Sequence, residues 1–202
     1  MQSFTEAILR LFDDLGDRLA AAGLPSGAVR AYLFGGCAVH MYERNRVSED
    51  LDAEFDYNLI HRDDVLLVLS ELPAVAYRSV AGREVGLNID RRFNTTLCPL
   101  HMDYQDRATQ LERGQSDASP LTVWLPNPMD VAISKLGRLS VVDVEDILVL
   151  LQEPSASWDE FERLATEASQ YYVGRNLAGT IAYVKLQWQR RKDNDASSED
   201  VK

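Results

Sequence analysis

The stretch LFGGCAVHMYERNRVSEDLDAEFD, residues 33–56, determines how the first half of the chain is interpreted. Its apolar start leads into Gly35 and Gly36, and Asp50 and Asp52 open a second strand-like run. Paired glycines let a chain turn tightly and pass close to phosphate, because no Cβ stands in the way. Aspartates at i and i+2 on a strand point to one face, where they can share a divalent cation. The stretch therefore predicts a site for a metal-bound nucleoside triphosphate.

Composition limits the class of protein and its partners. The chain has 202 residues, of which 46% are apolar and 26% charged, as in an ordinary globular protein with one well-formed core and room for a helical extension. The net charge of −11 argues against DNA and anionic membranes as partners, whereas a local basic groove for RNA and a basic protein partner remain compatible with it. Two isolated cysteines form neither a disulfide framework nor a zinc site. With no apolar run near ~20 residues and no signal peptide, we expect a cytoplasmic protein.

Periodicity and turn residues predict an α+β fold in which a mixed β-sheet is flanked by helices and followed by a C-terminal helical region. The expected strands are residues 29–34, 50–56, 75–81, 84–90, 95–104 and 121–125. The expected helices are residues 4–22, 37–45, 62–72, 127–139, 143–151, 157–172 and 175–190, with Asp143 capping the fifth of them. We expect an α/β core over residues 1–126, a helical region over 127–190, and a disordered tail over 191–202.

The acidic residues define the candidate catalytic and metal-binding group. In-line attack on an α-phosphate is favoured by two metal ions held by carboxylates. Asp50 and Asp52 are the first pair. A third carboxylate usually comes from a neighbouring strand, and Asp103 suits this role because it ends the predicted strand 95–104. Glu54 and Asp56 are the alternatives, since they continue the acidic face of residues 50–56.

Five residues are candidate ligands for the nucleotide. The backbone N–H groups of Gly35 and Gly36 lie at an expected helix start, which suits phosphate oxygens. Arg46 and Ser48 precede the aspartates and can hydrogen-bond the triphosphate, and Lys135 on a later helix can reach its β- or γ-phosphate. These features also have plain structural interpretations. The glycine pair can be an ordinary tight turn, and Asp50 and Asp52 can mark the solvent-facing side of a strand. Lys135 can pack its stem on the protein while its amine reaches water.

Two separated blocks resemble the AbiEii-type branch of the polymerase-β-like nucleotidyltransferase superfamily. GGCAVHMYERNRVSEDLD resembles that branch's GGxA and R-x-S-x-D-h-D motifs, and PNPMDVAISKLGRLSVVDVEDILVLL resembles its downstream helices. In the second block the matching residues are Lys135, Arg138, Asp143 and Asp146. The resemblance implies a minimal nucleotidyltransferase core, Mg²⁺ or Mn²⁺ as cofactor, and transfer of NMP from an NTP to a tRNA 3′ end. It also implies a toxin of a toxin–antitoxin or phage-defence system, with a cognate antitoxin protein as partner.

Alternative functions stay open at this point. Some members of the superfamily modify hydroxyls of proteins instead of RNA. A module that keeps the fold but has weak or no activity, and binds a nucleotide or a partner protein, is the main alternative to an enzyme. For RNA binding the chain offers two tyrosines that can stack on bases, Tyr171 and Tyr172. Local cations available for RNA are Arg138, Arg175, Arg190, Arg191 and Lys192.

Overall fold

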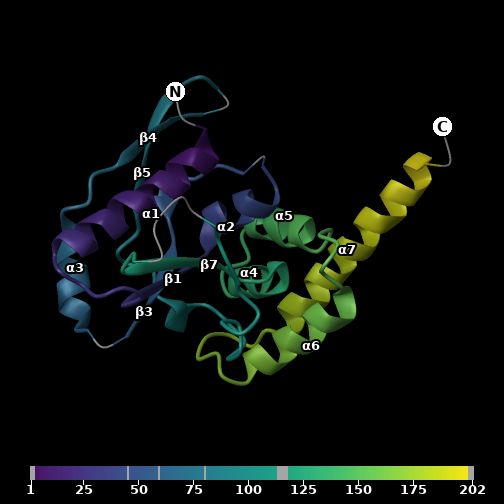
Figure 1. Ribbon diagram of the computed structural model, residues 1–202. Helices are drawn as coiled ribbons and strands as arrows, with labels where there is room; N and C mark the ends of the chain where they lie inside the picture. Colours follow the sequence, from purple (N-terminus) through teal and green to yellow (C-terminus); the bar gives the residue numbers. More distant parts are fainter. Residues whose placement is uncertain (1–2, 45, 59, 80, 113–117, 200–202) are drawn as a thin grey trace. The chain divides into compact units, whose positions relative to one another are not determined.

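The computed structural model describes residues 3–199 apart from 45, 59, 80 and 113–117 (Figure 1). Its contacts divide the chain into two compact units. The first consists of Met1–Phe93 and Gln105–Asn127, and the second of Asn94–Tyr104 and Pro128–Lys202. The first unit holds mixed sheets with helices and the second is helical, which confirms the predicted α+β class. Residues 94–104, which the sequence places in the α/β core, belong to the helical unit.

The first unit contains three helices and seven strands among its described residues. The helices are α1 (Phe4–Ala21), α2 (Gly35–Tyr42) and α3 (Arg62–Ser70). The strands are β1 (Val29–Leu33), β2 (Asp50–Leu51), β3 (Ala53–Tyr57), β4 (Val75–Arg78), β5 (Glu84–Ile89), β6 (Thr109–Gln110) and β7 (Leu121–Leu125).

These strands form two mixed sheets. The larger has the order β3-β1-β7-β6, in which β1 runs parallel to β7 and antiparallel to β3. The smaller has the order β2-β5-β4, in which β2 is parallel to β5 and β4 and β5 form an antiparallel hairpin. Helix α1 packs against β4, β5 and β7 and so covers strands of both sheets. Its apolar positions at helical spacing are buried, and the predicted capping box of Ser3 and Glu6 starts it.

The acidic run 50–56 passes from one sheet to the other. Residues Asp50–Leu51 pair with β5, whereas Ala53–Tyr57 pair with β1, so Asp52 lies at the junction. Leu51 and Ala53 are buried on the apolar face of this run. The single predicted strand is therefore two strands in the structure, and the change of partner places the Asp52 backbone beside the end of β1, where Phe34 N–H donates to the Asp52 carbonyl at 2.8 Å.

The second unit is helical. Its elements are the 3₁₀ turn η1 (Thr95–Leu97) and the helices α4 (Pro128–Lys135), α5 (Val141–Leu150), α6 (Trp158–Ser169) and α7 (Ala178–Glu199). Helix α4 packs against α5 and α6, and α7 against α5 and α6, which buries Leu136, Ile147, Phe161 and Val184. Among the described helices of both units, none combines the length and hydropathy of a membrane span.

The predicted strand 95–104 is wrong. The side chain of Asn94 accepts a hydrogen bond from Thr96 N–H at 2.9 Å and so starts η1 instead of a strand. Pro99 has no N–H to give to a ladder. Further on, Tyr104 N–H donates to the His101 carbonyl at 3.1 Å, which closes a turn around Asp103.

Two helix ends differ from expectation. Ser140, not Asp143, is the N-cap of α5, and Asp143 is the third residue of a capping box in which each side chain bonds the other's backbone N–H. Helix α7 continues to Glu199, past the expected end near residue 190. Two contacts extend it: Arg191 pairs with Glu145 at 3.2 Å, and the Lys192 ammonium lies 4.1 Å from the centre of the Trp188 ring.

Candidate functional site

The Asp52 carboxylate lies against Gly35, at the start of α2. Gly35 has φ +62, and an ideal Cβ at this position would overlap Asp52 Oδ2 and lie 2.7 Å from Asp52 Cγ. Only glycine satisfies both the left-handed backbone and this close approach. The predicted meeting of the glycine pair with the second aspartate is thus present in the structure.

Gly36 brings the two predicted phosphate ligands to the same place. A Cβ on Gly36 would lie 3.2 Å from the Cβ of Ser48 and 3.6 Å from Cζ of Arg46. The Arg46 guanidinium donates from Nη1 to the Val47 carbonyl at 2.8 Å. A hydroxyl-bearing side chain, a guanidinium and a helix start therefore lie close together, and groups of these kinds can bind phosphate oxygens.

Asp50 lies two residues before Asp52, and both aspartates lie near Cys37. Cys37 Sγ donates to the Asp50 carbonyl at 3.5 Å. Burial raises the pKa of the Cys37 thiol, and the charges of Asp52 and Asp50 raise it further, while Arg46 acts in the opposite direction. Both carboxylates therefore act on the same buried thiol, which stays protonated and is a structural group at neutral pH.

The predicted metal ligands Asp50 and Asp52 are carboxylates, which are chemically suited to Mg²⁺ or Mn²⁺. Magnesium is commonly bound by one or two carboxylates, with substrate phosphates and waters completing its shell. In the part of the chain that the structure describes, no three His, Cys, Asp or Glu side chains gather as a metal site would need. Metal binding by Asp50 and Asp52, with a third carboxylate from Glu54, Asp56 or Asp103, therefore stays a prediction. Glu54 and Asp56 lie on β3, where Asp56 is exposed.

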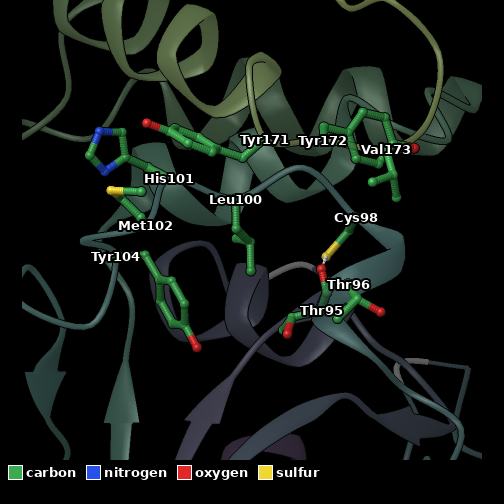
Figure 2. Close-up of a pocket in the computed structure, with 10 residues that line it drawn as sticks. All are labelled: Thr95, Thr96, Cys98, Leu100, His101, Met102, Tyr104, Tyr171, Tyr172 and Val173. Atoms are coloured by element: carbon green, nitrogen blue, oxygen red, sulfur yellow. Dashed lines mark hydrogen bonds between the residues drawn. The ribbon is translucent and has the colours of Figure 1, made fainter.

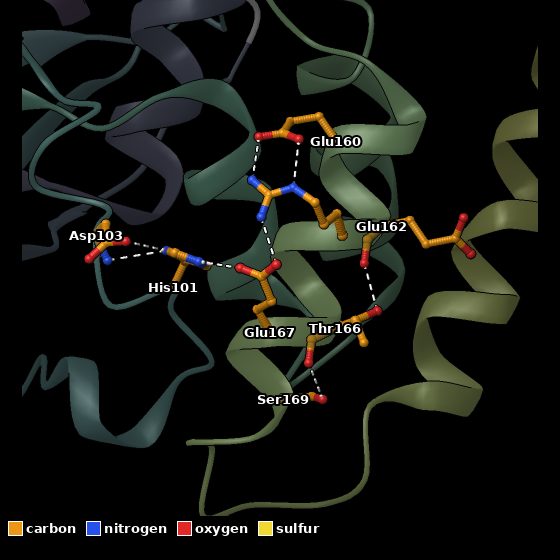
Figure 3. Close-up of polar contacts among 8 residues, drawn as sticks. His101, Asp103, Glu160, Glu162, Thr166, Glu167 and Ser169 are labelled. Carbon is orange, nitrogen blue, oxygen red and sulfur yellow. Dashed lines mark hydrogen bonds and ion pairs between the residues drawn. The ribbon is translucent and has the colours of Figure 1, made fainter.

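Asp103 belongs to the second unit and is held by a histidine there. Its backbone N–H donates to His101 Nδ1 at 3.1 Å, and its carboxylate lies 3.9 Å from the same nitrogen. The ring proton is therefore on His101 Nε2, which donates to Glu167 at 2.8 Å (Figure 3). The turn that places Asp103 is thus fixed by α6.

Lys135 is also held within the second unit. Only 6% of its side chain is exposed, and its amine donates to Asp146 Oδ2 at 2.9 Å. Lys135 and Asp146 thus form a buried ion pair between α4 and α5, and a role for Lys135 at a phosphate stays a prediction.

Comparison with known proteins assigns the family. The profile of DUF6036, described as a nucleotidyltransferase of unknown function, matches residues 11–195. The chain belongs to this family. Among solved structures, an antigenic nucleotidyltransferase-like protein from Paracoccidioides brasiliensis is similar, with a TM-score of 0.51 and 16% identity over 95% of this chain and 91% of that one. That likeness concerns the fold alone, and no curated protein matches the chain.

The DUF6036 assignment supports the nucleotidyltransferases in general but does not single out the AbiEii-type branch. The superfamily resemblance rests on the residues around Gly35 and Asp52. These are the residues that the structure brings together.

Two residues that the sequence did not identify as functional hold the loop that carries Arg46 and Ser48 in this DUF6036 member. His40 Nδ1 donates to the Arg46 carbonyl at 2.6 Å, and the Tyr77 hydroxyl donates to the Ser48 carbonyl at 3.0 Å. The Phe4 ring packs on both, with centroid distances of 4.7 Å. Burial lowers the pKa of His40, so the imidazole is neutral and its Nε2 accepts from Thr5. His40 and Tyr77 therefore position Arg46 and Ser48.

The hydrogen bonds to the Asp143 carboxylate predict that part of the free energy of unfolding is lost in acid. Burial raises its pKa, but hydrogen bonds from Arg138 (two at 2.7 Å) and Ser140 outweigh this and hold the pKa at about 2, below the ordinary 3.8. A lowered carboxylate pKa stabilises the fold above pH 4, and this contribution is lost as the pH falls toward 2. We expect Asp143→Asn to cost roughly 2 kcal/mol at pH 7, measured by urea unfolding. The variant should also lose less stability than wild type between pH 4 and pH 2; equal losses would contradict this assignment.

Proposed function

We propose that this DUF6036 protein transfers NMP from an NTP to an acceptor hydroxyl at the Gly35–Asp52 site. The observation that carries the proposal is the close fit of the Asp52 carboxylate on Gly35, with Ser48 and Arg46 beside Gly36. The Asp52 carboxylate, a glycine helix start and two polar side chains suited to phosphate occur together there. Each is weak evidence alone, and their convergence in space is what a metal–triphosphate site requires.

In this proposal the backbone N–H groups of Gly35 and Gly36 bind non-bridging phosphate oxygens, because the first N–H groups of a helix have no partner within it. Ser48 and Arg46 bind the β- and γ-phosphates and hold the pyrophosphate in line for departure. Their own carbonyls are fixed by His40 and Tyr77, so they are presented without a large entropic cost.

Asp50 and Asp52 would hold Mg²⁺ or Mn²⁺, which when bound neutralises charge on the triphosphate and acidifies the acceptor hydroxyl. The acceptor oxygen forms a bond to the α-phosphorus as the bond from that phosphorus to the bridging oxygen breaks. NMP is thereby joined to the acceptor, pyrophosphate leaves, and the hydroxyl proton passes to solvent. The balance requires no redox partner.

For the acceptor we propose the 3′ end of tRNA, and for the biological role a toxin paired with a cognate antitoxin. The AbiEii-type motifs around Arg46 and Asp52, and Lys135 with Arg138, support this assignment. Exposed Tyr171 and Arg175 in the second unit offer a stacking ring and a cation for RNA.

The acceptor is tested with α-labelled NTPs, Mg²⁺ or Mn²⁺, and total tRNA. We expect label on tRNA from at least one NTP. As a control, tRNA whose terminal 2′,3′-diol has been oxidised with periodate should accept none, because its 3′ hydroxyl is gone. Equal labelling of oxidised tRNA would contradict a 3′-end acceptor. Label on protein in place of RNA would identify a protein hydroxyl as the acceptor, and no label from any NTP would favour the binding module.

A further inference from the structure

A cavity in the second unit is lined by aromatic rings. Its volume is about 360 Å³, within the range of small-molecule sites. Tyr104, Tyr171, Tyr172 and the His101 imidazole contribute to its walls, and Thr95 and Thr96 supply hydroxyl-bearing side chains (Figure 2). In Figure 2 the Tyr171 ring is drawn above Leu100 and the Tyr104 ring below it. Planar rings with a few polar groups are suited to a flat heterocycle, which stacks by its face and hydrogen-bonds at its edge.

The His101 wall of this cavity is rigid. Both ring nitrogens are engaged, Nδ1 by Asp103 N–H and Nε2 by Glu167. Glu167 in turn accepts from Arg163 at 2.6 Å, and Arg163 makes two bonds of 2.9 and 2.7 Å to Glu160. Hydrogen bonds from His101 and Arg163 lower the pKa of Glu167, so the Glu167 carboxylate is ionised at neutral pH. With its nitrogens used, His101 presents an apolar ring surface whose orientation is set in advance.

A cation lies next to the Tyr172 wall. An ideal Cβ on Gly137 would lie 2.8 Å from the Tyr172 hydroxyl, which places that ring at the turn after α4. The exposed Arg175 guanidinium donates to the carbonyls of Leu136 and Arg138, both at 3.3 Å, on the same turn. Because these acceptors are carbonyls and not carboxylates, they do not neutralise the positive charge of Arg175. In a chain of net charge −11, a guanidinium beside an aromatic cavity is the local feature that an RNA phosphate would select.

We propose that this cavity binds an unpaired base of the RNA acceptor, with an adjacent phosphate on Arg175. The inference rests on the proposed function for the identity of the RNA, and it adds a base-binding site within the second unit. Stacking of the base on the Tyr171 ring supplies the affinity for RNA. A base can enter the cavity and stack in this way only when it is unpaired.

The stacking role is tested by binding alone, with no NTP or metal present. The probe is a 5′-fluorescein octaribonucleotide ending in CCA, and the readout is fluorescence anisotropy. Tyr171→Leu should weaken binding by roughly 5- to 100-fold, while Tyr171→Phe, which keeps the ring, should bind nearly as wild type. Tyr171 is 62% exposed, so its replacement should not unfold the unit. Tyr183→Leu is the matched control, since Tyr183 is 46% exposed on α7 and does not line the cavity.

Arg175→Gln tests the phosphate contact. We expect a weaker Kd for the same probe and a slope of log Kd against log salt that is smaller by roughly 0.7, the value for one phosphate contact on a single strand. An unchanged salt slope would overturn the placement of a phosphate at Arg175.

The outcomes separate this inference from the proposed function. Loss of probe binding in Tyr171→Leu supports the cavity whether or not NMP transfer occurs. Equal binding by wild type, Tyr171→Leu and Tyr183→Leu would overturn it even if transfer is observed. Annealing the probe to its complement should weaken binding, and equal binding of the duplex would also overturn it. Displacement of the probe by ATP without metal would assign the cavity to the base of the NTP and overturn the acceptor assignment.

Discussion

Asp52→Asn is expected to lower NMP transfer by ~10³-fold or more, because a metal-binding carboxylate stabilises the transition state by several kcal/mol. The substitution keeps the size of the side chain and its place on Gly35, so the fold should be retained. Initial rates with a labelled NTP and tRNA measure the effect. If the protein is a toxin, growth inhibition on expression should disappear in the same variant.

Glu84→Gln is the matched control for this substitution. Glu84 is an exposed carboxylate at the start of β5 in the same unit. We expect its removal to leave transfer within a factor of two of wild type. Transfer by Asp52→Asn at a rate near that of Glu84→Gln would contradict the assignment of Asp52.

Gly35→Ala is expected to destabilise the protein by roughly 2–4 kcal/mol and to impair transfer. A Cβ at φ +62 costs about 1–2 kcal/mol, and its overlap with the Asp52 carboxylate adds the cost of moving that side chain or the helix start. Urea unfolding followed by circular dichroism measures the loss.

Gly27→Ala provides the comparison, since Gly27 has φ +67 and nothing within 4 Å of an added Cβ. Gly27→Ala should lower the free energy of unfolding by about 1–2 kcal/mol, which is the cost of the left-handed backbone alone. The difference between the two variants therefore reports the contact with Asp52. Equal destabilisation by both would show that the carboxylate does not lie on Gly35.

The convergence of the site in the first unit could be predicted because its parts are close in sequence. Gly35 and Gly36 end a buried strand, and Asp52 returns on the adjacent strand after one short helix. The alternation of Leu51 and Ala53 with acidic residues fixed which face was buried. A local pattern that requires one turn and one pairing leaves few alternative geometries.

Features that depend on distant partners could not be predicted. Asp103 was expected at a strand end, but Pro99 and the side-chain contacts of Asn94 and His101 favour turns over an extended ladder. The ion pair between Lys135 and Asp146 depends on how α4 and α5 pack. The hydrogen bonds from His40 and Tyr77 to the loop 46–48 likewise involve backbone carbonyls, which carry no signature in the sequence.

The most direct test of nucleotidyl transfer asks which phosphate of the NTP is joined to the acceptor. Wild-type protein is incubated with tRNA, Mg²⁺ or Mn²⁺, and NTPs labelled at either the α- or the γ-phosphate. The account predicts covalent label on tRNA from the α-phosphate of at least one NTP and none from the γ-phosphate. Asp52→Asn should lower the α-label by ~10³-fold or more. Covalent transfer of the γ-label would show phosphoryl transfer instead and would contradict the account.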